Sequence, residues 1–288
     1  GYPTTVGVIQ DTFQGGFMDV GITAFAADGK SLIYSTYLGG SEAEQPHSMM
    51  SDAQGNLYVF GITSSLDFPT TPTAYDTSYN GGVGVSIENL PFVNGSDIFI
   101  TALSPLGDNL VGSTFYGGSH NDGFNQNLKV QYGDHSKGEI YLGNQKVYIA
   151  SSTLSSDIPT VNAIQDSTVA GQDALLLRLS KDLAQLEWAT YYGGIGSQGA
   201  MGCKLNPVNG HLYTVGTTTT GAYTFPVNSY QPTFLGGARD GFIAAFDTST
   251  FALVYGSYNG TANADGNYAM DVDFDGEVYL MGLTNGLY

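Results

Sequence analysis

Short runs of alternating apolar and polar residues recur along the whole chain. The runs are rich in β-branched and aromatic side chains, and residues typical of turns, mainly Gly, Asp and Asn, separate them. This pattern is typical of antiparallel strands, so the sequence predicts an all-β fold. No run reaches the roughly 18 consecutive apolar residues that a membrane-spanning helix needs, and we expect no membrane insertion.

One phrase of the sequence occurs four times. A Ser or Thr and an aromatic residue lead into a Gly-Gly step, and the fourth copy is looser than the other three. The copies are Tyr34–Gly40, Gly112–Gly118, Ala189–Gly194 and Tyr255–Gly260. Tandem repetition of this kind indicates one repeat array. Residues that all copies share are expected to be structural, because one active site rarely needs four sets of parts.

Three more landmarks accompany this phrase in a fixed order. An aromatic or aliphatic residue precedes proline at Pro3, Pro69, Pro159 and Pro226. An aspartate opens an apolar run at Asp19, Asp97, Asp173 and Asp240. A tyrosine-centred run follows at Tyr58, Tyr148, Tyr213 and Tyr279. The prolines are 66, 90 and 67 residues apart, which divides the chain into copies of approximately 1–66, 67–156, 157–223 and 224–288.

Each copy supplies four strand candidates. The Asp-initiated run pairs with the Ser/Thr-Tyr run across one short turn, and a third strand pairs with the tyrosine-centred run across another. Four antiparallel strands per copy predict one blade of a β-propeller, a fold that hides its sheet edges by radial repetition. Because the first and last residues cut the repeat at nearly the same phase, we expect the chain to be part of a longer protein.

The repeat resembles the SBBP ("seven-bladed beta-propeller") repeat family. The resemblance rests on the segments 34–40, 52–63 and 67–71, and degraded versions extend it over nearly the whole chain. It implies a propeller in a large secreted or surface protein of bacteria, many of them Bacteroidetes with adhesins or exported proteins of the gliding and type 9 secretion kind. It implies no catalytic residue. The chain departs from the family in having four copies rather than seven.

The charge of the chain excludes two classes of partner. Eight Lys and Arg face 26 Asp and Glu, which gives a formal net charge of −18. Nucleic acid and anionic lipid bind basic patches, so neither is expected as a partner. The low Lys content and the many Asp, Asn, Ser, Thr and Gly residues fit an extracellular protein. The single cysteine, Cys203, excludes an internal disulfide and is expected to be a small buried side chain.

One segment resembles a calcium-binding loop. Asp271, Asp273 and Asp275 alternate before Gly276, as the first ligands of such a loop do. The twelfth position, however, is Gly282 instead of an acid. The aligned segment of the first copy is an ordinary Asp-Gly turn, so a hairpin turn is favoured over a Ca²⁺ site. No cofactor is expected, and the four strand-opening aspartates are expected to accept hydrogen bonds from turn N–H groups.

Residues unique to one copy are the better candidates for function. The second copy carries two insertions, 75–96 and 119–146. Polar and aromatic loops on a rigid scaffold are common binding surfaces, although a neutral elaboration is the alternative. The candidate binding residues are His120, Asn121, Asp122, Asn125, Gln126, Tyr132, Asp134 and His135. The only tryptophan, Trp188, is expected to pack between blades.

These features predict a non-catalytic binding or structural module of a secreted or cell-surface protein. Adhesion or protein–protein interaction is the expected activity, with a protein, a surface glycan or other domains of the same chain as partner. One alternative is a propeller enzyme acting on extracellular polysaccharide, which would cluster carboxylates with perturbed pKa values near the central channel. The other alternative is an inert spacer, which would have no pocket.

Overall fold

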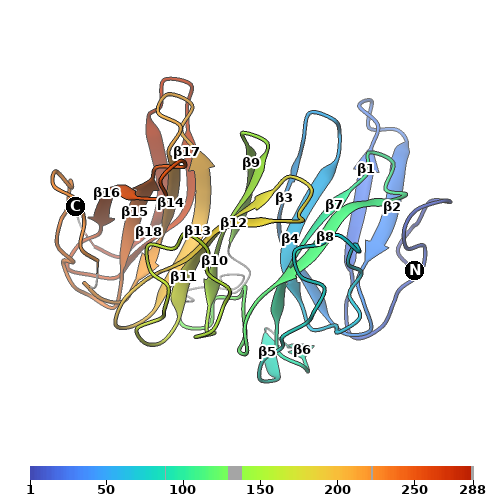
Figure 1. Ribbon diagram of the computed structural model, residues 1–288, viewed down its shortest axis with the longest axis horizontal. Coiled ribbons are helices and arrows are strands. Elements are labelled where there is room, and N and C mark those ends of the chain that lie inside the picture. Colours follow the sequence, from blue (N-terminus) through green and yellow to red (C-terminus); the bar gives the residue numbers. More distant parts are fainter. Residues whose placement is uncertain (88, 129–137, 222, 287–288) are drawn as a thin grey trace.

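The computed structural model describes residues 1–87, 89–128, 138–221 and 223–286 (Figure 1). Every regular element in these ranges is a β-strand, and all strand pairs are antiparallel. The all-β prediction is therefore confirmed. None of the described segments forms an apolar helix of membrane-spanning length.

Three four-stranded sheets form the body of the chain. The first full sheet contains β3 (Glu44–Ser51), β4 (Leu57–Thr63), β7 (Asp97–Leu103) and β8 (Leu110–Tyr116). The second contains β9 (Glu139–Gly143), β10 (Lys146–Thr153), β11 (Asp173–Ser180) and β12 (Leu186–Tyr192). The third contains β13 (Gln198–Leu205), β14 (Leu212–Thr218), β15 (Asp240–Phe246) and β16 (Leu253–Asn259).

Three two-stranded sheets complete the described structure. The first half-sheet contains β1 (Val20–Phe25) and β2 (Leu32–Leu38). The last half-sheet contains β17 (Asp265–Val272) and β18 (Val278–Thr284). A small hairpin, β5 (Val85–Ile87) and β6 (Leu90–Phe92), lies within the first insertion of the second copy.

The sheets do not coincide with the sequence repeats, so the expectation of one blade per copy is wrong. Each full sheet joins the last two strands of one copy to the first two strands of the next. The register is the same each time, with Thr63 opposite Asp97, Thr153 opposite Asp173 and Thr218 opposite Asp240. The tight turns determine each hairpin locally. The long Pro-Thr connection between hairpins carries no signal in the sequence that shows which two hairpins share a sheet.

The hydrophobic core lies between neighbouring sheets. Alternate strand residues point to the two faces, so each full sheet packs on both sides. Tyr58 and Phe60 of the first full sheet pack with Val147 and Ile149 of the second. Trp188 packs between the second and third sheets, with its ring stacked on Phe251 at 5.4 Å. The expected packing role of Trp188 and burial of Cys203 are confirmed.

The sheets follow one another in a row from the N-terminal to the C-terminal end (Figure 1). The strands at one edge contact each other in sequence, with β9 against both β3 and β13, and β13 also against β17. The two half-sheets lie at opposite ends of this row (Figure 1). Each end of the row therefore presents half of a sheet with a face that no neighbouring sheet covers.

Candidate functional site

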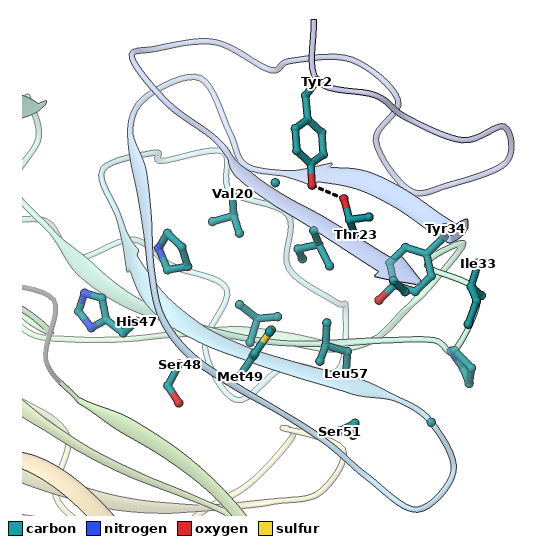
Figure 2. Close-up of a pocket in the computed structure, with 17 residues that line it drawn as sticks. Tyr2, Val20, Thr23, Ile33, Tyr34, His47, Ser48, Met49, Ser51 and Leu57 are labelled. Carbon is teal, nitrogen blue, oxygen red and sulfur yellow. Dashed lines mark hydrogen bonds between the residues drawn. The ribbon is translucent and has the colours of Figure 1, made fainter. Parts of the chain in front are cut away.

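A cleft of about 670 Å³ opens between the first half-sheet and the first full sheet. Figure 2 shows β1 with Val20 and Thr23 on one side, and His47, Met49 and Leu57 on the other. The described residues that line the cleft include no Asp, Glu, Lys or Arg. Its walls are mainly aliphatic, formed by Val20, Ile22, Ala24, Ile33, Met49, Leu57 and Val59. Such a lining favours an apolar ligand over a sugar or an ion.

At the next interface between sheets, the position of this cleft is filled by packing of the inner strands β9 and β10 on the preceding sheet. In the next interface, Ile140, Val147 and Ile149 occupy the positions of Met49, Leu57 and Val59, and all three are buried against the preceding sheet. Met49 is instead 68% exposed. The first half-sheet covers the outer strands of the first full sheet and Val59, whereas Met49 and Leu57 on the inner strands stay at least partly exposed.

The strand beside the cleft has an unpaired edge. β7, β11 and β15 are the equivalents of β1 in the full sheets, and each has a neighbouring strand on both sides. Within the described part of the chain, β1 is paired with β2 alone. At one end it is anchored to the first full sheet, because the Glu44 N–H donates to the Met18 carbonyl at 2.8 Å. An unpaired edge of this kind is a template for adding a strand.

His47 lines the cleft at a bulge in β3, between Pro46 and Ser48. The side chain is partly exposed, but its ring nitrogens are enclosed and have no hydrogen-bond partner among the described residues. Burial lowers the pKa of His47 to about 3, so the imidazole is neutral at physiological pH. The ring contacts Phe60 edge-on at 5.2 Å, which makes it part of the uncharged wall.

Buried carboxylate pairs mark the opposite end of the strands. Each strand-opening aspartate has a second polar residue 25 positions later, and in three copies that residue is an acid. The pairs are Asp19 and Glu44, Asp97 and Asp122, Asp173 and Gln198, and Asp240 and Asp265. In the first three copies the pair lies against the first glycine of the Gly-Gly step, and in the fourth Asp240 lies against Gly260. A Cβ on Gly117 would be 2.5 Å from Asp97 Oδ1 and 3.0 Å from Asp122 Oδ2.

Hydrogen bonding distinguishes Asp97 from Asp122. Asp122 accepts from the Gly118 N–H at 2.7 Å, from Ser155 Oγ at 2.8 Å and from Thr153 Oγ1. Asp97 Oδ2 accepts from the Asn80 N–H at 2.6 Å, while no described residue donates to Oδ1. Burial raises the pKa of Asp97 to about 8 and that of Asp122 to about 6. Asp97, which has fewer hydrogen-bond donors, is therefore the carboxyl group of the pair that keeps its proton to the higher pH.

Three of the four strand-opening aspartates accept a hydrogen bond from a turn N–H group, as the sequence predicts. Asp19 accepts from the Gln14 N–H at 2.8 Å, and Asp240 accepts from the Leu235 N–H at 2.9 Å, as Asp97 does from Asn80. The raised pKa values arise mainly from desolvation. The two carboxylates of a glycosidase must reach a substrate, whereas both Asp97 and Asp122 are fully buried.

The structure exposes some of the candidate binding residues of the second copy and buries others. His120 and Gln126 are exposed, whereas Asn121, Asp122 and Asn125 are buried. Tyr132, Asp134 and His135 lie outside the described residues. Asp122 occupies the position of Glu44 in the first copy, so it belongs to the repeat. The third strand of this copy, β9, also falls within the range 119–146 that the sequence assigns to an insertion.

The segment 121–128 crosses from the first full sheet toward the third. Gln172 is fully buried and accepts hydrogen bonds from the backbone N–H groups of Gln126 and Asn127 at 2.8 and 3.1 Å. Its Nε2 donates to Asn125 Oδ1 at 2.8 Å. Farther along, the Leu128 carbonyl accepts from Arg239 at 3.0 Å. This segment, termed the strap, therefore ties neighbouring sheets together.

Replacing Gln172 by alanine is expected to destabilise the protein by about 2–4 kcal/mol, because several buried polar groups lose their partner together. Thermal unfolding followed by circular dichroism measures the loss. Gln54→Ala is the matched control, since Gln54 is exposed and bonds only Lys181 through its side chain. Equal melting temperatures of the two variants would contradict a strap that holds the sheets.

Two of the three aspartates of the calcium-like segment, Asp271 and Asp273, have separate partners. Asp273 Oδ1 accepts from the N–H groups of Asp275 and Glu277 at 3.0 and 2.9 Å, as Asp52 does in the first copy. Asp271 pairs with Lys204 at 3.2 Å. The described residues contain no group of three or more His, Cys, Asp or Glu that could hold a metal ion. The Asp273 geometry is that of a hairpin turn.

Comparison with known proteins adds no family to this description. No family model matches the chain, and no curated protein matches it. The cleft itself was missed by the sequence patterns, which treat β1 and β3 as ordinary strands. No local sequence signal marks it: Phe25 is apolar like its buried equivalents Leu103, Leu179 and Phe246, yet it is 62% exposed.

Proposed function

We propose that this chain is a non-catalytic binding module of a secreted or cell-surface protein, built as a β-propeller of the SBBP type. Its binding site is the cleft beside β1, and its partner is a protein segment that adds a strand to the β1 edge. One observation carries the proposal: an unpaired strand edge borders an apolar cleft of about 670 Å³. In strand addition, main-chain hydrogen bonds supply affinity and side-chain pockets supply specificity.

Two further observations support a protein partner over a polysaccharide. The described lining of the cleft carries no charged side chain, and its histidine is neutral. The paired carboxylates, which an enzyme would need, are buried in the three copies that contain them. The acidic composition, with a net charge of −18, supports an extracellular setting in which nucleic acid and anionic membranes are not partners.

A peptide with the sequence 56–64 tests the proposal, because β4 within this range is the strand that pairs with the β7 edge in the first full sheet. We expect the fluorescently labelled peptide to bind the chain with micromolar affinity in an anisotropy titration. A peptide with proline in place of Val59 and Gly61 should bind at least tenfold more weakly, since it lacks two N–H donors. Equal binding of the two peptides would exclude strand addition.

The non-catalytic part of the proposal has a separate test. The chain is incubated with a panel of bacterial and algal polysaccharides, and released reducing ends are measured. No release above that of a heat-denatured sample is expected. Turnover that disappears in an Asp97→Asn variant would overturn the proposal in favour of a polysaccharide-acting enzyme.

A further inference from the structure

The last half-sheet has a face and an edge that match the cleft. Tyr279, Met281 and Leu283 of β18 correspond to Tyr58, Phe60 and Ile62 of β4, which are all buried. In β18 the same positions are open, with Tyr279 54% and Met281 68% exposed. Val278 and Leu280, on the other face of β18, pack against the third full sheet. The exposed face of β18 therefore has the side chains of a surface that packs against another sheet, but no sheet of the described structure covers it.

The three full sheets predict the register in which β18 would pair with β1. In each full sheet the threonine that ends the tyrosine-centred strand lies opposite the strand-opening aspartate. Applied to β18 and β1, this register places Thr284 opposite Asp19, Met281 opposite Ile22 and Val278 opposite Phe25. The resulting strand order, β17-β18-β1-β2, would be that of a full sheet. Each half-sheet supplies the two strands that the other lacks.

The side chains on the two sides of this contact are also complementary. Tyr58 and Phe60 of the first full sheet pack on Val147 and Ile149 of the second. By the same geometry, Tyr279 and Met281 would pack on Leu57 and Val59, which line the cleft together with Met49. A second cavity, of about 380 Å³ and lined by Tyr213, Ile243 and Tyr255, lies where the outer strands of a following sheet would pack. It would receive the first half-sheet of the next chain.

We propose that the β17–β18 hairpin of a second copy of this chain occupies the cleft and pairs in register with β1, so that copies assemble head to tail. This proposal rests on the proposed function and names the partner at the same site. The proposed pairing of β18 with β1 repeats the pairing that joins the two hairpins of each full sheet. A second copy is favoured over the same copy because the two half-sheets lie at opposite ends of the row (Figure 1). Such a contact joins different surfaces, so it yields a ring or an open chain of copies.

Single-cysteine variants of the full chain test this register. Ile22→Cys chains carrying a size tag are mixed with Met281→Cys chains and treated with a short thiol-to-thiol cross-linker, because directly opposed Cβ atoms lie about 5 Å apart. We expect a mixed dimer, with at least five times the yield obtained when Leu280→Cys replaces Met281→Cys. The pleat turns residue 280 to the other face. Cys203 is buried, and any cross-linking through it is measured with the unmodified chain.

Mass measurement by light scattering completes the test. The unmodified chain should show a mass that rises with concentration, and Met281→Arg should reduce the association at least tenfold. Phe274→Arg is the control, since Phe274 is fully exposed at the tip of the β17–β18 turn. A chain with both Ile22→Cys and Met281→Cys that cross-links within a single monomer would overturn assembly between copies. Folded variants that give no mixed dimer would overturn it as well.

The peptide titration separates the two proposals. If the 56–64 peptide binds and no mixed dimer forms, the β1 edge binds strands but its partner is another protein. If neither the peptide nor a second copy binds, strand addition at this edge is excluded and the proposed function fails with it.

Discussion

The protein is expected to unfold at a higher temperature at pH 5 than at pH 8. Burial raises the pKa of Asp97 to about 8 and that of Glu44 to about 7. It raises the pKa values of Asp122, Asp173 and Asp240 to about 6. All of these groups belong to the pairs beneath the Gly-Gly steps. In the unfolded chain the same carboxyl groups have pKa values near 4.

The direction of the effect follows from proton binding. Each of these groups holds its proton more tightly in the folded chain, so its stabilising contribution is complete below about pH 4 and is lost as the pH rises through 6 to 8. One pKa unit corresponds to about 1.4 kcal/mol, so the groups together account for several kcal/mol. Carboxyl groups with lowered pKa values, such as Asp52 and Asp157, lose their contribution only as the pH falls below about 4.

Circular dichroism at pH 5, 6, 7 and 8, at constant ionic strength, measures this dependence. A gain in melting temperature of roughly 5–10 °C is expected between pH 8 and pH 5. Asp97→Asn should raise the melting temperature at pH 8 and flatten the profile, because the amide has the same shape and stays neutral. Asp275→Asn, at an exposed site, controls for the general loss of negative charge. A melting temperature that falls from pH 8 to pH 5 would contradict burial of the carboxylate pairs.

Replacing Gly193 by alanine is expected to cost about 3 kcal/mol or more, or to prevent folding. The added methyl group would overlap Asp173 Oδ1 and lie 2.7 Å from Gln198 Oε1. Both side chains are fully buried, and Gln198 Oε1 accepts from the Gly194 N–H at 3.0 Å, so Gln198 cannot move aside without losing this bond. The same steric reason explains why the first glycine of the step recurs in all four copies.

The control for this variant is Gly210→Ala. Nothing lies within 4 Å of a Cβ at Gly210, and its φ of +72° costs an alanine only about 1 kcal/mol. A double variant, Gly193→Ala with Asp173→Ala, removes the overlapping carboxylate and should recover part of the lost stability in urea unfolding. If Gly193→Ala were as stable as Gly210→Ala, the packing of the carboxylate pair against the Gly-Gly step would be wrong.

The strands could be predicted from the sequence because their signals are local. The run that begins at Asp97 is β7, and the tyrosine-centred run around Tyr58 is β4. Their pairing could not be predicted, because the two strands are joined by 33 residues of insertion and connection, from Ser64 to Ser96. The partner of β4 is selected by packing between sheets, which no local pattern records. The repeat copies therefore predict most of the strands, with β9 assigned to an insertion, and place the sheet boundaries wrongly.

The candidate site was less predictable than the fold. Asp122 and Asn125 are polar residues in a copy-specific segment, which favours a binding loop in sequence, yet both are buried in contacts that hold the sheets together. Polarity alone does not distinguish a surface contact from a satisfied interior one. The cleft depends on which strand edges lack a neighbour. That property belongs to the ends of the row and appears only once the sheets are assembled.

Amide hydrogen exchange of β1 tests the central claim most directly, because it reports on the hydrogen-bonding edge itself. In the free chain at low concentration, β1 should exchange faster than β7, its equivalent in a full sheet. With the 56–64 peptide at saturation, the amides of 20–25 should slow by at least tenfold, while β8 stays unchanged. Unchanged exchange in β1, or protection confined to the strap at 121–128, would contradict the β1 edge as the binding site.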